Sequence, residues 1–447
     1  MALCKLLIAN RGEIARRIIR TCRALDIRTV AVYSEADKDA PHVREADEAV
    51  CLGPPPVAQS YLNIEAVIRA AKATGAEAVH PGYGFLSENA AFAERCEHEG
   101  LVFIGPPADV IRAMGSKIEA RRRMAEAGVP IVPGTEAPVE SLEEALDKAA
   151  TIGYPVMLKA SVGGGGIGMS RVDSEAELRK VFQSSRDRAQ NFFGDGTLLL
   201  EKWIDGARHI EVQVAADAYG NVVHLFEREC SIQRRHQKII EESPSPDLAD
   251  ALRTRLCQAA VQGARAIGYR NLGTMEFIFD PEGHFYFLEM NTRLQVEHPV
   301  TEMITGLDLV AWQIRIAAGE PLPLAQEDIV RRGAAIECRI YAEDPVRFLP
   351  SPGTITSLAW PKEARVDAGV EAGTAVTPFY DPLIAKLITH GASREEAVER
   401  MTRALRDTAI EGIKTNLPLL TEVMEHPAFR KGRYDTHFLP KMIAAKT

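Results

Sequence analysis

The sequence lacks any hydrophobic run long enough to cross a membrane. Its N-terminal apolar stretch at 6–9 is short and is followed directly by Asn10 and Arg11. A membrane-spanning helix needs about 20 apolar residues, and a signal peptide needs an apolar region of at least about 7. Neither is predicted, so we expect a cytoplasmic protein, or one of an equivalent reducing compartment, with no membrane partner.

Cysteine is sparse, and positive charge is in deficit. The seven cysteines form no CxxC pair and no cluster with histidine, which excludes a disulfide framework or a structural zinc site and favours reduced thiols. Lys and Arg total 53 against 62 Asp and Glu, a formal net charge of -9. This balance argues against nucleic-acid binding but leaves room for a local basic pocket that binds phosphates.

Two common nucleotide-binding motifs are also absent. The turn at 9–13 reads ANRGE where a dinucleotide fold would carry G-x-G-x-x-G, so a dehydrogenase has little support. The order G-x-x-x-x-G-K-[ST] of a P-loop does not occur either. Any nucleotide site must therefore be built in another way.

Strands and helices nevertheless alternate through the first hundred residues, which predicts an α/β fold with a parallel sheet covered on both faces. The predicted strands are 5–9, 29–33, 76–80 and 101–104, and the predicted helices are 12–25, about 62–74 and about 88–99. Loops rich in proline and glycine at 81–84 and 105–107 follow two of the strands, where open α/β sheets bind ligands.

The chain of 447 residues is too long for one core, and two or three domains are expected. A second block begins near Met114 and includes a small lobe at about 130–203, a hairpin and helices to about 319. An acidic Pro/Ser-rich loop at 241–250 interrupts this block, and 319–323 marks its end. Beyond it we predict strands at 334–341, 353–357 and 383–389 and an amphipathic helix at 394–408.

The hairpin at 272–299 carries the most specific signal. Two apolar runs flank the turn sequence PEGH at 281–284, which is typical of antiparallel strands. If the turn is a four-residue loop, Asp280 pairs with Phe285 and Glu276 lies opposite Glu289. Like charges opposed across a sheet are destabilising, so this pair predicts a divalent cation, most plausibly Mg²⁺.

The polar residues after Glu289 extend this prediction. If the strand continues, Asn291, Arg293, Gln295 and Glu297 share its face. If the segment is helical instead, Glu289, Arg293 and Glu297 still share a face. A solvated polar face is the simpler alternative, but the apolar, aromatic flanks argue against it. Metal ligands, a cation and a spare carboxylate are thus predicted to converge.

A glycine-rich loop supplies a second candidate. The sequence VGGGGIG at 162–168 follows a predicted strand at 155–160, and successive glycines let backbone N–H groups approach phosphate oxygens. Lys159 and Lys117 would add positive charge. The alternative is a flexible surface linker with ordinary surface lysines.

Two further segments fit a nucleotide site. The apolar strand at 198–204 could pair with an adenine edge, with Glu201 accepting from the amino group, although by itself it is typical of a core strand. The segment 230–238 is dense in cations after a predicted strand at 222–227. It is predicted to clamp an anionic substrate, with a solvated basic turn as the alternative.

Longer motifs now point to a known family. They are NRGEIA at 10–15, HPGYGFLSEN at 80–89, RRHQK at 234–238 and EMNTRLQVEHPVTE at 289–302, with FLPSPG at 348–353 and GIKTN at 412–416. Together they closely resemble biotin carboxylase, the ATP-grasp subunit of biotin-dependent carboxylases, over essentially the whole chain. The resemblance implies a Rossmann-like pre-ATP-grasp domain at 1–113, an ATP-grasp domain at 114–320 with a mobile lid lobe at about 130–203, and a mixed α/β domain at 330–440.

The resemblance also implies roles for individual residues. Contacts with ATP are implied for Lys117, Lys159, Gly165, Gly166, Glu201, Lys202, Trp203, Ile204, His209, Gln233 and His236. Mg²⁺ or Mn²⁺ would be bound by Glu276, Glu289 and Asn291. Lys238, Arg293, Gln295 and Val296 resemble the bicarbonate site. Glu297 would be the base that deprotonates bicarbonate, and Arg339 would face the ureido oxygen of biotin.

The implied reaction is the ATP- and bicarbonate-dependent carboxylation of biotin through carboxyphosphate, the first half-reaction of an enzyme such as the acetyl-CoA carboxylase of fatty acid biosynthesis. No Met-Lys-Met biotinylation motif occurs, so we expect biotin on a separate carrier protein. A further expected partner is a carboxyltransferase subunit. Family precedent suggests a homodimer. The final carboxyl acceptor is set by the partner transferase.

Two departures from the family pattern leave alternatives open. Val162 and Ile167 stand where relatives often carry Gly and Arg, so a cationic contact with the phosphates is missing. Either ATP binds more weakly, or backbone groups alone serve the loop, which we favour. The alternative functions are another ATP-grasp ligase and a catalytically impaired nucleotide-binding subunit.

Overall fold

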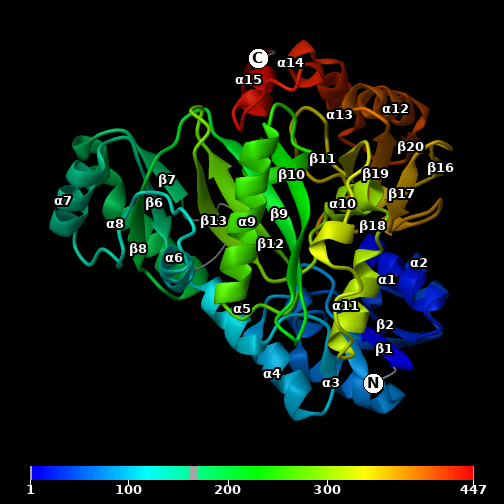
Figure 1. Cartoon of the computed structure of the whole chain (residues 1–447). Helices are drawn as coiled ribbons and strands as arrows, with labels where there is room; N and C mark the ends of the chain where they lie inside the picture. The colour runs from blue at the N-terminus through cyan, green and yellow to red at the C-terminus, as the bar shows by residue number, and fades with distance from the viewer. Residues whose placement is uncertain (1–2, 162–168, 446–447) are drawn as a thin grey trace.

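The N-terminal hundred residues form a five-stranded parallel sheet in the computed structural model, which describes residues 3–161 and 169–445 (Figure 1). Its strands lie in the order β3-β2-β1-β4-β5, and every neighbouring pair is parallel. The strands are β1 (Lys5–Ile8), β2 (Arg28–Ser34), β3 (Glu48–Gly53), β4 (Ala78–His80) and β5 (Val102–Phe103).

Alternation along β1 explains why helices cover both faces of this sheet. Leu6 and Ile8 pack in one core with α1 (Gly12–Ala24). Leu7 packs in another core with α3 (Ile64–Thr74) and α4 (Ala90–His98). The predicted α/β fold is confirmed. One strand was missed: β3, an edge strand whose residues are half-buried or exposed.

The small lobe has a core of its own and lies at the left of Figure 1. Its antiparallel sheet has the order β7-β6-β8, formed by β7 (Met169–Val172), β6 (Val156–Ala160) and β8 (Leu198–Lys202). The helices α7 (Leu142–Ile152) and α8 (Glu175–Phe193) pack on it. Each begins after a serine, Ser141 or Ser174, whose side chain accepts a hydrogen bond from a first-turn N–H.

An eight-stranded sheet runs through the centre of the molecule in the order β13-β12-β9-β10-β11-β14-β19-β17. Its strands are β9 (Arg208–Ala216), β10 (Val222–Arg234), β11 (Gln237–Ser243), β12 (Asn271–Phe279), β13 (Phe285–Asn291), β14 (Ala334–Tyr341), β17 (Arg365–Ala368) and β19 (Leu383–Gly391). Because β11 pairs with β14, the sheet crosses the expected boundary at 320–330. The central and C-terminal parts of the chain therefore share one sheet.

Two predictions about this region were wrong in detail. The strand predicted at 222–227 is longer, because β10 continues to Arg234 and only Arg235 and His236 connect it to β11. Both residues have positive φ, 51° and 65°, as tight two-residue hairpin turns require. The expected loop at 241–250 is also shorter, because β11 continues to Ser243 and α9 (Asp250–Ala266) begins at Asp250.

The C-terminal part confirms two predicted strands, β14 and β19, and α12 (Arg394–Asp407). The predicted strand at 353–357 is instead broken in two. β15 (Gly353–Thr354) pairs with β18 (Ala375–Val376), and β16 (Ser357–Ala359) pairs with β20 (Ala409–Glu411). The change of partner explains the break.

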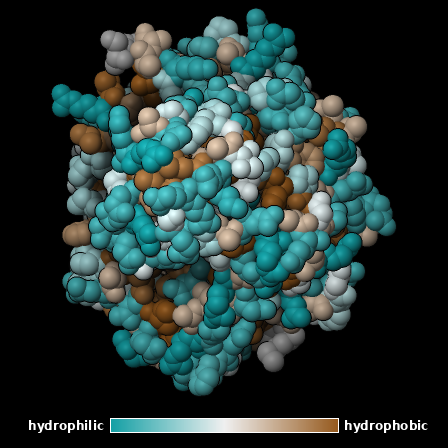
Figure 2. Space-filling view, turned by 90° about the vertical axis from the view of Figure 1, so that its left-hand side faces the viewer, coloured by the Kyte–Doolittle hydropathy of each residue, from teal (hydrophilic) through white to brown (hydrophobic). Residues whose placement is uncertain are grey.

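The remaining helices connect these sheets or cover them. They are α2 (Pro41–Glu45), α5 (Ala108–Gly115), α6 (Lys117–Glu126), α10 (His298–Thr305), α11 (Leu309–Ala317), α13 (Leu417–Glu425), α14 (Pro427–Arg430) and α15 (Phe438–Ala444), with 3-10 turns at Glu35–Asp37, Val57–Gln59 and Gln326–Asp328. Among the described residues, no helix combines the length and apolarity that crossing a bilayer needs. The side of the molecule shown in Figure 2 is largely hydrophilic, with small scattered hydrophobic areas.

Candidate active site

The predicted pairing of Glu276 with Glu289 is confirmed, but the loop that produces it was predicted wrongly. The first strand pair is Phe279–Phe285, not Asp280–Phe285, so the loop has one residue more than expected. An irregularity between the pairs Phe277–Phe287 and Glu276–Glu289 then shifts the register by one. The two differences cancel, and the carboxylates lie opposite each other as expected.

The polar residues after Glu289 converge, although the segment continues neither as a strand nor as a helix. β13 ends at Asn291, and α10 begins only at His298. Arg293 donates to Asn291 Oδ1 at 3.0 Å and to Gln295 Oε1 at 2.8 Å. Gln295 in turn donates to Glu276 Oε1 at 3.3 Å. Side-chain hydrogen bonds, rather than a regular period, bring these residues together.

Lys238 links the acidic pair to Glu297. Its ammonium lies 2.5 Å from Glu211 Oε2, 2.7 Å from Glu276 Oε1 and 2.8 Å from Glu297 Oε1. Burial alone would lower the pKa of Lys238, but these three carboxylates raise it well above its usual value. Lys238 is therefore a permanent cation in contact with a predicted metal ligand and with the predicted base.

Glu297 is fully buried between two cations. Besides Lys238, it accepts a hydrogen bond from Arg339 Nη2 at 3.0 Å. Burial alone would raise the pKa of Glu297, but Lys238, Arg339 and Arg228 lower it well below its usual value. The group is an ionised carboxylate, which is the protonation state that a base needs.

Arg339 is shared by two carboxylates. Its Nη2 atom lies 2.5 Å from Glu241 Oε1 as well as 3.0 Å from Glu297 Oε2. Burial and the charge of Glu297 raise the pKa of Glu241 to about 7, although Arg339 acts in the opposite direction. Arg339 thus extends from β14 to the Glu297 carboxylate.

Several predicted nucleotide residues lie together near the lobe. Lys159 pairs with Glu201, which Arg121 also contacts at 2.8 Å. The Glu201 side chain is therefore already engaged by two cations. The pKa of Lys117 is lowered by burial first and by the nearby charge of Lys159, while Glu289 opposes the shift. Lys117 is therefore near enough to both Lys159 and Glu289 to feel their charges.

The other predicted nucleotide residues lie on β8, β9 and β10 and on the loops that follow β8 and β10. His209 Nε2 lies 2.9 Å from Glu276 Oε2, and its Nδ1 lies 2.6 Å from the Gln233 amide. Lys202 donates to Gly153 O at 2.7 Å, and the Arg171 guanidinium lies 5.1 Å from the centre of the Trp203 ring. Ile204 follows β8, and His236 lies in the β10–β11 turn. Gly165, Gly166, Val162 and Ile167 lie outside the described residues.

The donor set fits a divalent cation. Burial first, and the charge of Glu276 second, raise the pKa of Glu289, so the two carboxyl groups disfavour each other's charge. A cation between them would remove that repulsion, and Asn291 offers a neutral oxygen ligand. His209 and Glu211 also lie near Glu276, with ligand atoms within 4.8 Å of one another. Glu276 belongs to both groupings.

Sequence reasoning missed several residues of this site. Arg228 is fully buried and donates to Glu211 Oε1 at 2.5 Å and to Gln213 Oε1 at 2.8 Å. A usable signal was present in β9, where His209, Glu211 and Gln213 alternate with apolar residues. Arg121 and Glu241 carried no comparable signal.

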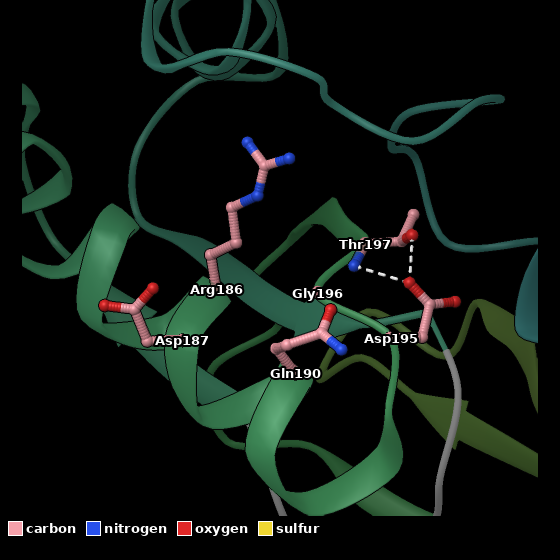
Figure 3. A pocket seen from close by; sticks show the side chains of 6 residues that line it. All are labelled: Arg186, Asp187, Gln190, Asp195, Gly196 and Thr197. Carbon is pink, nitrogen blue, oxygen red and sulfur yellow. Dashed lines mark hydrogen bonds between the residues drawn. The ribbon is translucent and has the colours of Figure 1, made fainter.

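A polar hollow on the lobe is distinct from this site. It has a volume of about 250 Å³ and lies where α8 ends and the loop to β8 begins (Figure 3). It is lined by Arg186, Asp187, Gln190, Asp195, Gly196 and Thr197. Asp195 already accepts from the backbone N–H of Thr197 at 2.8 Å, and no predicted site residue is among the lining residues.

Comparison with known proteins gives matches along most of the chain. Residues 2–111 match the family described as biotin carboxylase, N-terminal domain, and residues 337–441 match the biotin carboxylase C-terminal domain. Residues 116–325 match the ATP-binding domain of the carbamoyl-phosphate synthase L chain.

Individual proteins align almost end to end. The chain is 60% identical to biotin carboxylase 2 of Bacillus subtilis (strain 168), covering 97% of this chain and 98% of that protein. Among solved structures, a similar one is the biotin carboxylase domain dimer of Hydrogenobacter thermophilus 2-oxoglutarate carboxylase, in complex with MgADP, ADP and bicarbonate. It is 50% identical with a TM-score of 0.95, and the match covers 99% of this chain and 98% of that chain. The biotin carboxylase subunit of a pyruvate carboxylase is also 50% identical, with a TM-score of 0.85, covering 100% and 99%.

Proposed function

Since the chain belongs to the biotin carboxylase family, we propose that it carboxylates biotin with ATP and bicarbonate, giving ADP, phosphate and carboxybiotin. One observation carries the proposal. The Lys238 ammonium touches both the predicted metal ligand Glu276 and the predicted base Glu297. Glu297, which would activate bicarbonate, therefore shares a contact with Glu276, which would hold the metal ion of the nucleotide.

The nucleotide would bind between the lobe and the central sheet. Glu276, Glu289 and Asn291 would hold Mg²⁺ or Mn²⁺, which supplies positive charge to the phosphates when bound. Lys117 and Lys159 add cations on the lobe side, with Gly165 and Gly166 as proposed backbone donors. Glu201 to Ile204, His209, Gln233 and His236 complete the proposed ATP contacts. The protein's contribution to phosphoryl transfer is then positioning and electrostatic stabilisation.

Bicarbonate would bind beside Arg293, Gln295, Val296 and Lys238. As an anion, it would compete with Glu297 for the ammonium of Lys238. A weakened ion pair raises the proton affinity of Glu297, which is otherwise held low by its cations. Glu297 would then take the bicarbonate proton, so that the oxygen attacks the γ-phosphate and carboxyphosphate forms.

Biotin would be held by Arg339. Carboxyphosphate would break down to CO2 and phosphate, and the released phosphate would take the N1 proton of biotin. N1 would then bond to the carbon of CO2, while the negative charge on the ureido oxygen is stabilised by the guanidinium through charge-assisted hydrogen bonding. Arg339 already contacts Glu297 at 3.0 Å. The carboxyl acceptor would therefore lie next to the place where carboxyphosphate forms.

The experiment is ADP release by purified protein with ATP, Mg²⁺ and free biotin. Release that depends on both bicarbonate and biotin supports the proposal. Release that is independent of biotin would favour another ATP-grasp ligase. No release at saturating Mg·ATP would favour a catalytically impaired nucleotide-binding subunit.

Partners and location belong to the same proposal. We infer a biotin carrier protein and a carboxyltransferase as partners, because carboxybiotin must be used by a second reaction, and one solved relative is the biotin carboxylase subunit of a larger carboxylase. A homodimer is supported by the dimer of the Hydrogenobacter thermophilus protein. A cytoplasmic location and a role in acetyl-CoA carboxylase remain proposals of the sequence. We further propose the division into domains at 1–113, 114–320 and 330–440.

A further inference from the structure

Lys386 is a fully buried cation in the middle of β19. Its ammonium donates to the backbone carbonyl of Val296 at 2.7 Å and lies 3.2 Å from Glu13 Oε1. A buried lysine is strongly unfavourable unless its charge is paired and its hydrogen bonds are made. The contacts with Val296 and Glu13 therefore determine where this side chain lies.

The three contacting residues come from distant parts of the chain. Glu13 belongs to α1 in the N-terminal sheet domain, and it also accepts a hydrogen bond from Tyr83. Val296 lies in the central part, between β13 and α10. Lys386 itself belongs to the C-terminal part. One ammonium thus connects all three parts beneath the site.

The turn at Val296 carries the proposed base. Gln295 and Glu297 flank Val296, and Glu297 is the residue before the first turn of α10. Among the described residues of this turn, the side chain of Glu297 makes no capping hydrogen bond at the helix start. The segment 292–297 belongs to no strand or helix, so contacts outside a regular ladder help to fix its backbone, and the Lys386 hydrogen bond is one of these.

Strand register connects the same lysine to Arg339. Lys386 pairs with Arg339 across β14 and β19, so the two side chains leave the sheet on the same face. Arg339 contacts the Glu297 carboxylate, while Lys386 contacts the carbonyl immediately before it. The β14–β19 ladder therefore sets the distance between the biotin-facing cation and the backbone of the base.

We propose that Lys386 is a positioning residue that holds the 295–297 turn against the sheet and so places Glu297 between Lys238 and Arg339. Lys386 acts through Val296 and touches no substrate. The inference rests on the proposed function, because the placement matters only if Glu297 deprotonates bicarbonate. Displacement of a reacting group by about 1 Å can lower turnover by about 10²-fold.

The test compares Lys386→Met with Thr389→Val. Thr389 lies on the same strand and is buried, and its hydroxyl donates to Ala397 O at 3.0 Å, away from the turn. We expect Lys386→Met to speed amide hydrogen exchange in a peptide covering 292–299 by about tenfold or more, on the scale of losing one buried hydrogen bond. Thr389→Val should leave that peptide unchanged.

A kinetic readout separates positioning from general destabilisation. For Lys386→Met, kcat should fall by about 10- to 100-fold and KM for bicarbonate should rise, while KM for Mg·ATP stays within about twofold. Equal changes in both KM values, or unchanged exchange at 292–299, would overturn the proposal. If Lys386→Met does not fold, Lys386→Arg keeps the charge with a longer head group. An unchanged KM for bicarbonate in that variant would also overturn it.

Failure of the two proposals can be told apart. If the wild-type protein releases no ADP with bicarbonate and biotin, the proposed function fails. The exchange comparison still decides whether Lys386 holds the turn, because it needs no turnover.

Discussion

Glu276 and Glu289 lie directly opposite each other on β12 and β13, and a different lysine lies near each of them. Lys238 contacts Glu276 at 2.7 Å, whereas Lys117 lowers the pKa of Glu289 only in part, against the effects of burial and of Glu276. The charge of Glu289 is therefore only partly compensated by Lys117. A bound divalent cation would complete the balance.

Removing one carboxylate should uncouple the metal from nucleotide binding. We expect Mg²⁺ to increase the thermal stabilisation of the wild-type protein by ADP, since a ligand at about 100 times its Kd stabilises the folded state by about 2.7 kcal/mol. In Glu289→Gln that Mg²⁺-dependent part should largely disappear. Melting temperatures with ADP in Mg²⁺ or in EDTA measure it.

Glu282→Gln is the matched control, because Glu282 lies exposed in the loop of the same hairpin. It should respond to Mg²⁺ like the wild type. An unchanged Mg²⁺ response in Glu289→Gln would remove Glu289 from the metal site.

The Glu297–Arg339 contact predicts two losses of activity. Glu297→Ala and Arg339→Ala should each lower turnover by about 10²-fold or more, the usual effect of losing a base or a key charge-stabilising donor. Steady-state ADP release with bicarbonate and biotin measures this. Arg347→Ala provides a control, since Arg347 is exposed on the segment after β14. Near wild-type rates in either test variant would exclude the proposed role.

The raised pKa of Glu241 predicts how the free energy of unfolding depends on pH. Its folded-state pKa is raised from 4.5 to about 7, so the folded protein retains a proton that the unfolded chain loses. Its contribution to stability is therefore present below pH 4.5 and is lost as pH rises toward 7. Compared with Glu241→Gln, the wild type should lose up to about 3 kcal/mol over this range.

Urea unfolding of both proteins at intervals from pH 5 to pH 8 provides the measurement. The difference between them should grow toward neutral pH and level off above it. A difference that is constant across the range would show that Glu241 does not titrate there.

The contact between Lys238 and Glu211 predicts a strong energetic coupling between these two residues. Lys238→Met leaves Glu211, Glu276 and Glu297 without their shared cation and should destabilise the protein by about 3–5 kcal/mol. Adding Glu211→Gln removes one of the three carboxylates and should restore part of that loss. A double-mutant cycle measured by urea unfolding gives the coupling. Additive effects would contradict the shared contact.

The sequence was most informative where a short-range rule determines geometry. The alternation of strands and helices through the first hundred residues predicted the parallel sheet covered on both faces, and the two cores on either side of β1 agree with it. The hairpin prediction for Glu276 and Glu289 succeeded through two cancelling differences, since neither the longer loop nor the irregularity in β13 has a distinctive sequence signal. Correct pairing therefore did not require a correct loop.

Short-range rules cannot predict contacts between residues that lie far apart in the sequence. Arg228 meets Glu211 because β9 and β10 pair, and Lys386 meets Val296 because β19 packs beneath a turn 90 residues earlier in the chain. A lysine inside the apolar run of β19 signals an unusual buried charge, but not its partner. The residue roles implied by family resemblance stay predictions until the variants above are measured.

The pairing of β11 with β14 also governs how the protein can be dissected. Cleavage between Ala318 and Gly333 would leave two fragments, each with a row of unsatisfied backbone groups along a freshly opened strand edge. Such edges promote association, so neither fragment is suited to separate expression. Chimeric proteins made from two relatives should accordingly take both β11 and β14 from the same parent.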